Sequence, residues 1–217
     1  MKKIILSITI LCLISSTGFS QAFKKNSFVF NGGLGVGIGL AFQNYTPSAY
    51  SQYNQSSKNP TAGLMLPIAA EFALNDTWGI GLTYANNTYI NFESDKSKLN
   101  NIGVFGALHF SNKVNSESYL RLNAGLSFAS FNDNTIVSYS NDETYSYKMT
   151  GGFFKPSIGF RNYFGEHFGI FLDGGLGIYS VSTNTAESSY YGSQTLNEKF
   201  RMKLVGAEIT FGLAVKL

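Results

Sequence analysis

Cysteine, charge and long hydrophobic runs are all scarce in this sequence. Its single cysteine is Cys12, so residues 13–217 hold no disulfide, no reactive thiol and no cysteine-ligated metal. Charged residues make up 13% of the chain, and no run beyond residue 20 approaches the roughly twenty apolar residues of a transmembrane helix. Apolar residues also lack the spacing of a helix face. These absences exclude disulfide scaffolds, thiol enzymes and helical membrane proteins.

The net charge gives no sign of a nucleic-acid partner. The formal charge is +3, but Lys2 and Lys3 belong to the N-terminal segment described next, and without them it falls to about +1. His109 and His167 have no ligand set near them in the sequence, so we expect no metal and no cofactor.

The N-terminus has the three regions of a secretory signal peptide. Met1-Lys2-Lys3 is basic, residues 4–14 are apolar, and small or polar residues follow. We therefore predict a signal peptide over residues 1–20, with cleavage near residues 20–22, after either Ser20 or Ala22. The remaining domain, residues 23–217, would be exported.

Strict alternation of apolar and polar residues defines the last stretch of the chain, residues 203–217. One face carries Val205, Ala207, Ile209, Phe211, Leu213, Val215 and Leu217. A period of two predicts a β-strand with one apolar face. About fourteen residues is longer than the usual five or six of strands in soluble sheets.

Seven more stretches alternate in the same way. They cover residues 28–42, 61–74, 78–87, 100–110, 120–128, 154–161 and 168–179. Short connections near residues 75–76, 111–117 and 165–166 alternate with long polar ones over residues 43–60, 91–99, 132–146 and 182–198. This pattern predicts an all-β fold, an eight-stranded antiparallel up-and-down transmembrane β-barrel. Its short turns would face the periplasm and its long loops the outside of the cell.

The main alternative is a soluble β-sandwich or lipocalin-like barrel, whose apolar face would point inward and whose outer face would be charged. Here the face opposite the apolar one is mostly glycine, alanine, serine and threonine. Small residues suit the narrow interior of an eight-stranded barrel. Aromatic residues also gather near the strand ends, where interfacial girdles belong. The pattern therefore favours the membrane barrel.

A signal peptide followed by eight such strands resembles the small OmpA-like and OmpX-like outer-membrane β-barrel proteins. The chain ending resembles their assembly signal at Thr210, Gly212, Val215 and Leu217, although leucine replaces the commoner final phenylalanine. The resemblance implies the outer membrane of a Gram-negative bacterium and a non-enzymatic role in the cell envelope. Its expected partners are outer-membrane lipid, lipopolysaccharide and the barrel-assembly machinery.

Several charged residues fall on the face predicted to point inward. This lumen polar network comprises Glu71, His109, Arg121, Lys155, Arg161, Asp173 and Glu208. Charges in a low-dielectric interior must be paired, so the simplest role is a polar plug that fastens the barrel. The alternative is a small gated pore, in which Arg121, Arg161 and Glu71 exchange partners.

A third possibility is a lipid A-modifying enzyme, because His109-Phe110-Ser111-Asn112 resembles the His-x-Ser-Asn element of lipid A deacylases, with Glu117 able to orient the histidine. The predicted topology places this segment at the periplasmic end, whereas lipid A lies in the outer leaflet. The loops, rich in tyrosine, asparagine and serine, offer adaptable binding surface without naming a partner.

Overall fold

The computed structural model describes residues 22–46, 55–91, 96–133, 145–183, 186–188, 192–194 and 199–217. The expected signal peptide lies outside these residues. Eight long strands form the body: β1 (Phe28–Thr46), β2 (Gln55–Ala73), β3 (Trp78–Asn91), β4 (Lys96–Asn112), β5 (Ser116–Asp133), β6 (Tyr145–Tyr163), β7 (Phe168–Thr183) and β10 (Lys199–Lys216). In the described part of the chain, no helix is long and apolar enough to cross a membrane.

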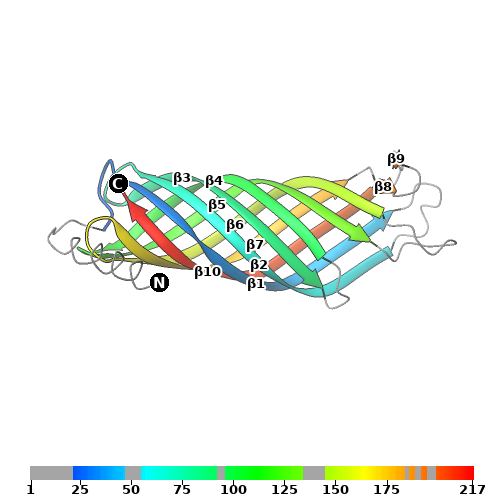
Figure 1. Ribbon diagram of the computed structural model, residues 1–217, viewed down its shortest axis with the longest axis horizontal. Helices are drawn as coiled ribbons and strands as arrows, with labels where there is room; N and C mark the ends of the chain where they lie inside the picture. Colours follow the sequence, from blue (N-terminus) through cyan, green and yellow to red (C-terminus); the bar gives the residue numbers. More distant parts are fainter. Residues whose placement is uncertain are drawn as a thin grey trace, which may run out of the picture.

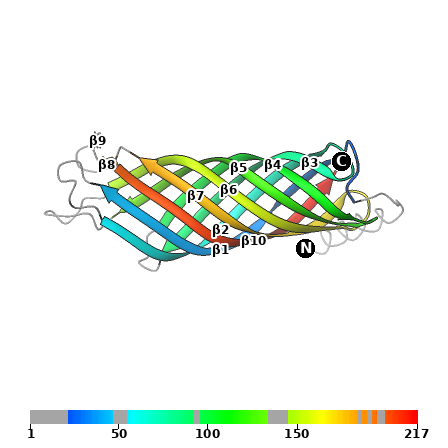
Figure 2. The same cartoon turned by 180° about the vertical axis from the view of Figure 1, so that it is seen from behind.

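The eight long strands close into an antiparallel barrel (Figures 1 and 2). Each strand pairs with its neighbour in sequence from β1 to β7, and β10 pairs with both β7 and β1. Phe28 and Leu217 exchange backbone hydrogen bonds of 3.0 and 2.8 Å, so the first and last strands meet at one end. That end also carries the three short turns, and we call it the short-turn end; the other is the long-loop end.

The register fixes the strand tilt. One circuit of the barrel by register partners starts at Gly32 and returns to β1 at Phe42, ten residues further along. The partners on the way are Ile68, Tyr84, Ile102, Leu126, Gly152, Ser180 and Lys203. Eight strands with a stagger of ten tilt by about 40° and enclose a radius of about 8 Å. Such a barrel is filled by side chains rather than by an open pore.

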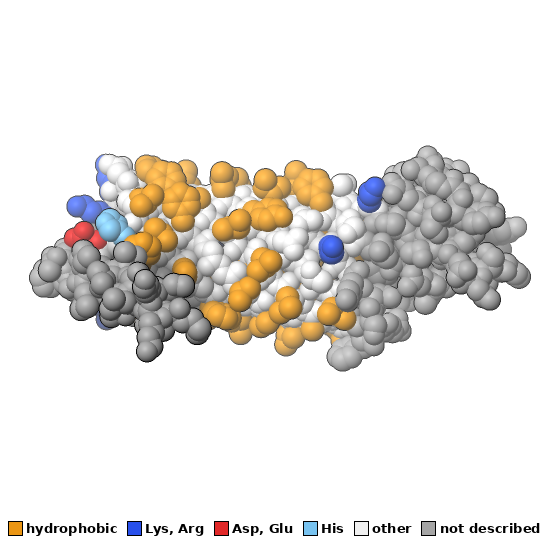
Figure 3. All heavy atoms as spheres, in the orientation of Figure 1, with side chains coloured by type: hydrophobic (Ala, Val, Ile, Leu, Met, Phe, Trp, Pro, Cys, Tyr) orange, Lys and Arg blue, Asp and Glu red, His pale blue; other side chains and the backbone are white. Residues whose placement is uncertain are grey.

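The barrel wall has an apolar outer face and a polar inner face. Leu122 and Leu213 are 50% and 67% exposed, whereas Arg121 and Asp173 are 7% and 4% exposed. Exposed apolar side chains occur on all eight long strands, and on the face shown in Figure 3 they form a belt across the middle of the molecule. Because an exposed apolar belt on a closed barrel suits lipid and not water, the membrane-barrel prediction is confirmed and the soluble alternative is wrong.

The strands extend further toward the long-loop end than the sequence predicted. β2 begins at Gln55 and not at residue 61, and β6 begins at Tyr145 and not at residue 154. These extensions lie beyond the apolar belt, where the outward residues become polar while inward residues of β6 such as Met149 and Phe153 are apolar, so the alternation that marked the membrane strands is lost. The stretch predicted as the fourth long connection also holds two short strands, β8 (Ala186–Ser188) and β9 (Gly192–Gln194); β8 pairs with β6, and β9 pairs with β8.

Candidate functional site: the barrel interior

The seven residues predicted to form a lumen network all point into the barrel. Six are buried, and Lys155 is partly buried with 16% of its side chain exposed. They occupy two levels: Glu71, His109 and Arg161 lie at the short-turn end, while Arg121, Lys155, Asp173 and Glu208 lie near mid-barrel. A third level, toward the long-loop end, is apolar.

The level at the short-turn end is an ion cluster of Glu71, His109, Glu117 and Arg161. His109 lies between the two carboxylates, with Nε2 2.8 Å from Glu71 and Nδ1 2.7 Å from Glu117. Arg161 bridges the same two carboxylates, donating to Glu71 and, at 2.8 Å, to Glu117. All four side chains are fully buried. The cluster therefore ties strands β2, β4, β5 and β6 together across the lumen.

Tyr119 stacks against both interior arginines. The guanidinium carbons of Arg161 and Arg121 lie 4.5 and 4.7 Å from the centre of its ring. The ring lies over its register partner Gly159 on the neighbouring strand β6, where a Cβ atom would overlap it. A glycine is required at this position because the aromatic ring fills the space that a side chain would take.

The segment before β1 closes the short-turn end. Phe23 is fully buried and stacks on His109, with ring centroids 3.5 Å apart and an interplanar angle of 10°. The backbone amide of Ala22 donates to the carbonyl of Lys113 at 3.0 Å, and the backbone amide of Asn26 donates to the carbonyl of Ala73 at 3.0 Å. Residues 22–27 thus form a lid over the ion cluster, which we call the N-terminal lid.

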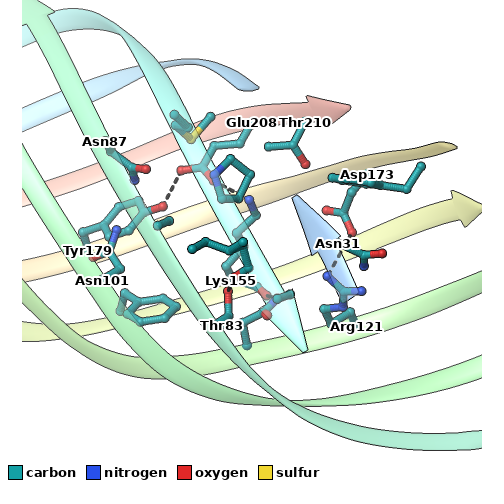
Figure 4. Close-up of a pocket in the computed structure, with 18 residues that line it drawn as sticks. Asn31, Thr83, Asn87, Asn101, Arg121, Lys155, Asp173, Tyr179, Glu208 and Thr210 are labelled. Carbon is teal, nitrogen blue, oxygen red and sulfur yellow. Dashed lines mark hydrogen bonds and ion pairs between the residues drawn. The ribbon is translucent and has the colours of Figure 1, made fainter. Parts of the chain in front are cut away.

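The middle level surrounds a cavity of about 50 Å³ (Figure 4). Arg121 lies 3.6 Å from Glu71 and 3.8 Å from Asp173, so it connects the two levels. The Lys155 ammonium lies 2.7 Å from Glu208. A polar cavity of this size accommodates about three ordered waters.

The level toward the long-loop end is an inner apolar cluster that the sequence analysis missed. Its members are Ala41, Tyr89, Leu99, Ala129, Met149, Phe153, Tyr179, Val181, Phe200, Met202 and Leu204. The hydroxyls of Tyr89 and Tyr179 donate to Glu208, which joins this cluster to the polar level below. The sequence feature that could have predicted this cluster is the presence of bulky apolar residues at inward positions, such as Leu99 and Met149.

The ion cluster also contains a residue that the sequence analysis placed in a turn. Glu117 lies on β5, where Glu117, Tyr119, Arg121 and Asn123 all face inward. Extending the two-residue alternation of this strand toward its start would have found Glu117 and Tyr119. Phe23 precedes the first strand and gave no periodic signal.

The geometry around His109 does not support the deacylase alternative. Both ring nitrogens already contact carboxylates, so neither is available to take a proton from a serine nucleophile. The side chain of Ser111 lies outside the described part of the structure. Among the described residues, no group of three or more histidine, cysteine, aspartate or glutamate side chains could hold a metal ion.

The four residues of the expected assembly signal lie on β10 and just after it. Thr210 is buried on the inner face, and Gly212 faces the same way. Val215 and Leu217 face outward, and Leu217 is 71% exposed. The alternation predicted for this stretch is present throughout.

The fold has counterparts among solved structures. One is the outer membrane protein OprG from Pseudomonas aeruginosa, with 12% identity, a TM-score of 0.53, and coverage of 90% of this chain and 98% of that chain. The chain has the fold of an outer-membrane β-barrel. The sequence-based expectation of a small barrel of this type is therefore confirmed at the level of the fold.

Two further structures are more distant. The Escherichia coli outer membrane protease OmpT has 9% identity, a TM-score of 0.44, and coverage of 90% and 98% of the two chains. Neisserial surface protein A has 16% identity, a TM-score of 0.39, and coverage of 82% and 95%. No protein-family model and no curated protein sequence matches the chain.

Proposed function

We propose that this outer-membrane barrel acts without catalysis, as a structural component of the cell envelope whose long loops make contacts at the cell surface. The observation that carries this proposal is the filled interior. The N-terminal lid and ion cluster occupy the short-turn end, and the inner apolar cluster occupies the other end. A lumen filled at both ends favours a barrel that is a rigid support and not a channel.

The orientation follows the usual rule for these barrels. Short turns face the periplasm and long loops face outside, so both ends of the described chain lie on the periplasmic side. The outer belt then contacts lipid, with lipopolysaccharide as the neighbour in the outer leaflet. The outward Val215 and Leu217, with Thr210 and Gly212, form the signal by which the assembly machinery would recognise β10.

Two measurements test the proposal. The barrel should stay compact in unheated detergent and migrate differently on a gel after boiling. In planar bilayers it should give no conductance above that of the lipid alone. Steady conductance by the wild-type protein would contradict the structural role.

One observation favours a gated pore as a second candidate. Arg121 lies between two carboxylates at 3.6 and 3.8 Å, longer than the 2.8 Å contact of Arg161 with Glu117, so it could exchange partners at small cost. A pore of this kind would show brief openings that are lost in the Arg121→Ala variant. Openings that persist in that variant would exclude this gate.

A further inference from the structure

Basic side chains gather on the outer wall at the long-loop edge of the apolar belt. Lys58 on β2, Lys203 on β10 and Arg201 on β10 all face outward and are exposed. Figure 3 shows lysine or arginine side chains along this edge. We call these three residues the outer cation cluster.

The register brings the cluster together around one strand. Phe42 on β1 pairs with Lys203 on one side and with Lys58 on the other, so the two lysines flank it in a single row. Asn44, the next outward residue of β1, pairs with Arg201. Backbones two strands apart lie about 10 Å from each other, which two lysine side chains can span.

The cluster has no acidic counterpart among the described side chains. Those acids point into the barrel or lie at the short-turn end, namely Glu71, Asp76, Glu117, Glu166, Asp173 and Glu208. Lys58 stands over the Phe42 ring at 5.6 Å, and this contact leaves its ammonium beside the apolar belt. Three positive charges with no described ion pair indicate a site for an anion.

The outer wall between the cluster and the short-turn end is apolar, and it indicates what the rest of the ligand is. On β1 the outward residues next to Phe42 toward the short-turn end are Leu40 and Ile38, 36% and 69% exposed. On β2 and β10 the corresponding positions continue into Leu64 and Ile209, which are 67% and 54% exposed. A ligand with a phosphate at the cation level and acyl chains along the belt matches both parts.

We infer that the outer cation cluster binds the phosphate of a phosphorylated glycolipid in the outer leaflet. The inference rests on the proposed function for one point, that the long-loop end faces outside. Basic residues at a membrane surface attract anionic headgroups, and Lys58, Lys203 and Arg201 surround one strand closely enough to share a phosphate. In register alone, Lys98 and Lys148 also flank one residue, Ser130, across β4, β5 and β6.

The test uses the full barrel in detergent and native mass spectrometry with three lipids: bisphosphorylated lipid A, dephosphorylated lipid A and phosphatidylglycerol. Wild-type protein should prefer bisphosphorylated lipid A over both others. The Lys58→Gln/Lys203→Gln variant should lose about tenfold to thirtyfold in affinity for it, since each basic residue contributes about 1 kcal/mol at a membrane surface. The matched control is Lys24→Gln/Lys25→Gln, which removes two exposed lysines from the short-turn end and should bind normally.

The inference is overturned if Lys58→Gln/Lys203→Gln retains the wild-type preference, if both double variants lose it equally, or if phosphatidylglycerol binds as tightly as bisphosphorylated lipid A. Heat-modifiable gel mobility of each variant confirms that its barrel is folded. A barrel that is compact and non-conducting but does not prefer bisphosphorylated lipid A would refute this site and leave the proposed function standing. A wild-type barrel that conducts but still prefers bisphosphorylated lipid A would refute the proposed function and leave this site standing.

Discussion

Arg161 illustrates how a charge is kept inside this barrel. Its guanidinium is fully buried and neutralised by Glu71 and Glu117, while Tyr119 covers its face. Breaking a buried ion pair by removing one partner is far costlier than replacing the whole set, because the remaining charge is left uncompensated. Arg161 should therefore be among the least replaceable residues of the interior.

The Arg161→Met variant should lower the free energy of unfolding by about 3–5 kcal/mol. Urea unfolding of the barrel in phosphatidylcholine vesicles measures this, with Trp78, the single tryptophan and an outward residue, as the fluorescent probe. Lys113→Met removes an exposed cation and should stay within about 0.5 kcal/mol of wild type.

The same substitution should cost much less in the Glu71→Gln/Glu117→Gln background, where no carboxylate is left unpaired. An equal cost in both backgrounds would mean that Arg161 stabilises the barrel through packing and not through its charge.

Gly159 is the position where a single methyl group should disturb the cluster. Gly159→Ala would push the Tyr119 ring away from both arginines, and overpacking of this kind costs about 1–3 kcal/mol. Gly152→Ala on the same strand is the control, because its Cβ would meet nothing closer than the Gly125 carbonyl at 3.4 Å. Equal unfolding midpoints for the two variants would show that the ring can relocate freely.

At the scale of the strands, the sequence predicted much of the fold because one physical pattern governs it. Lipid on one side and a cramped lumen on the other impose alternation, so the eight strands and the inward direction of Arg121 and Asp173 could be predicted from residue order alone. The pattern weakens where a strand leaves the membrane, which is why the start of β6 was placed at residue 154 instead of Tyr145. Which inward side chains form ion pairs with one another depends on the tilt and stagger of the strands, and these cannot be predicted from the local sequence pattern.

The N-terminal lid is the element with the most direct test. Phe23→Ala should expose His109 to solvent from the short-turn end, because the stacked ring is what covers it. Modification by diethyl pyrocarbonate, followed by mass spectrometry, measures this exposure. In wild-type protein His167, whose side chain is 58% exposed, should react while His109, at 0%, should not.

In the Phe23→Ala variant His109 should react at a rate closer to that of His167. Phe164→Ala removes an exposed phenylalanine at the same end and should leave His109 protected. Protection that persists without Phe23 would show that the ion cluster excludes reagent by itself.

At the scale of the whole molecule, the apolar belt predicts how substitutions depend on depth. Ile209→Arg, in the middle of the belt on β10, should lower the free energy of unfolding in vesicles by about 2–4 kcal/mol. Thr150→Arg, facing outward on β6 beyond the belt, should cost about 0–1 kcal/mol. Similar costs at both positions would contradict a membrane placed around this belt.

The pairing of β1 with β10 has a consequence for synthesis and quality control. The ring is sealed between the earliest and the latest strands of the chain, from Val29↔Lys216 to Thr46↔Lys199. A product lacking β10 would present two long unpaired edges, on β1 and β7, that invite aggregation. Because β10 follows every other long strand in the chain, the wall can close only after β10 has been synthesised, and a shorter product keeps both open edges.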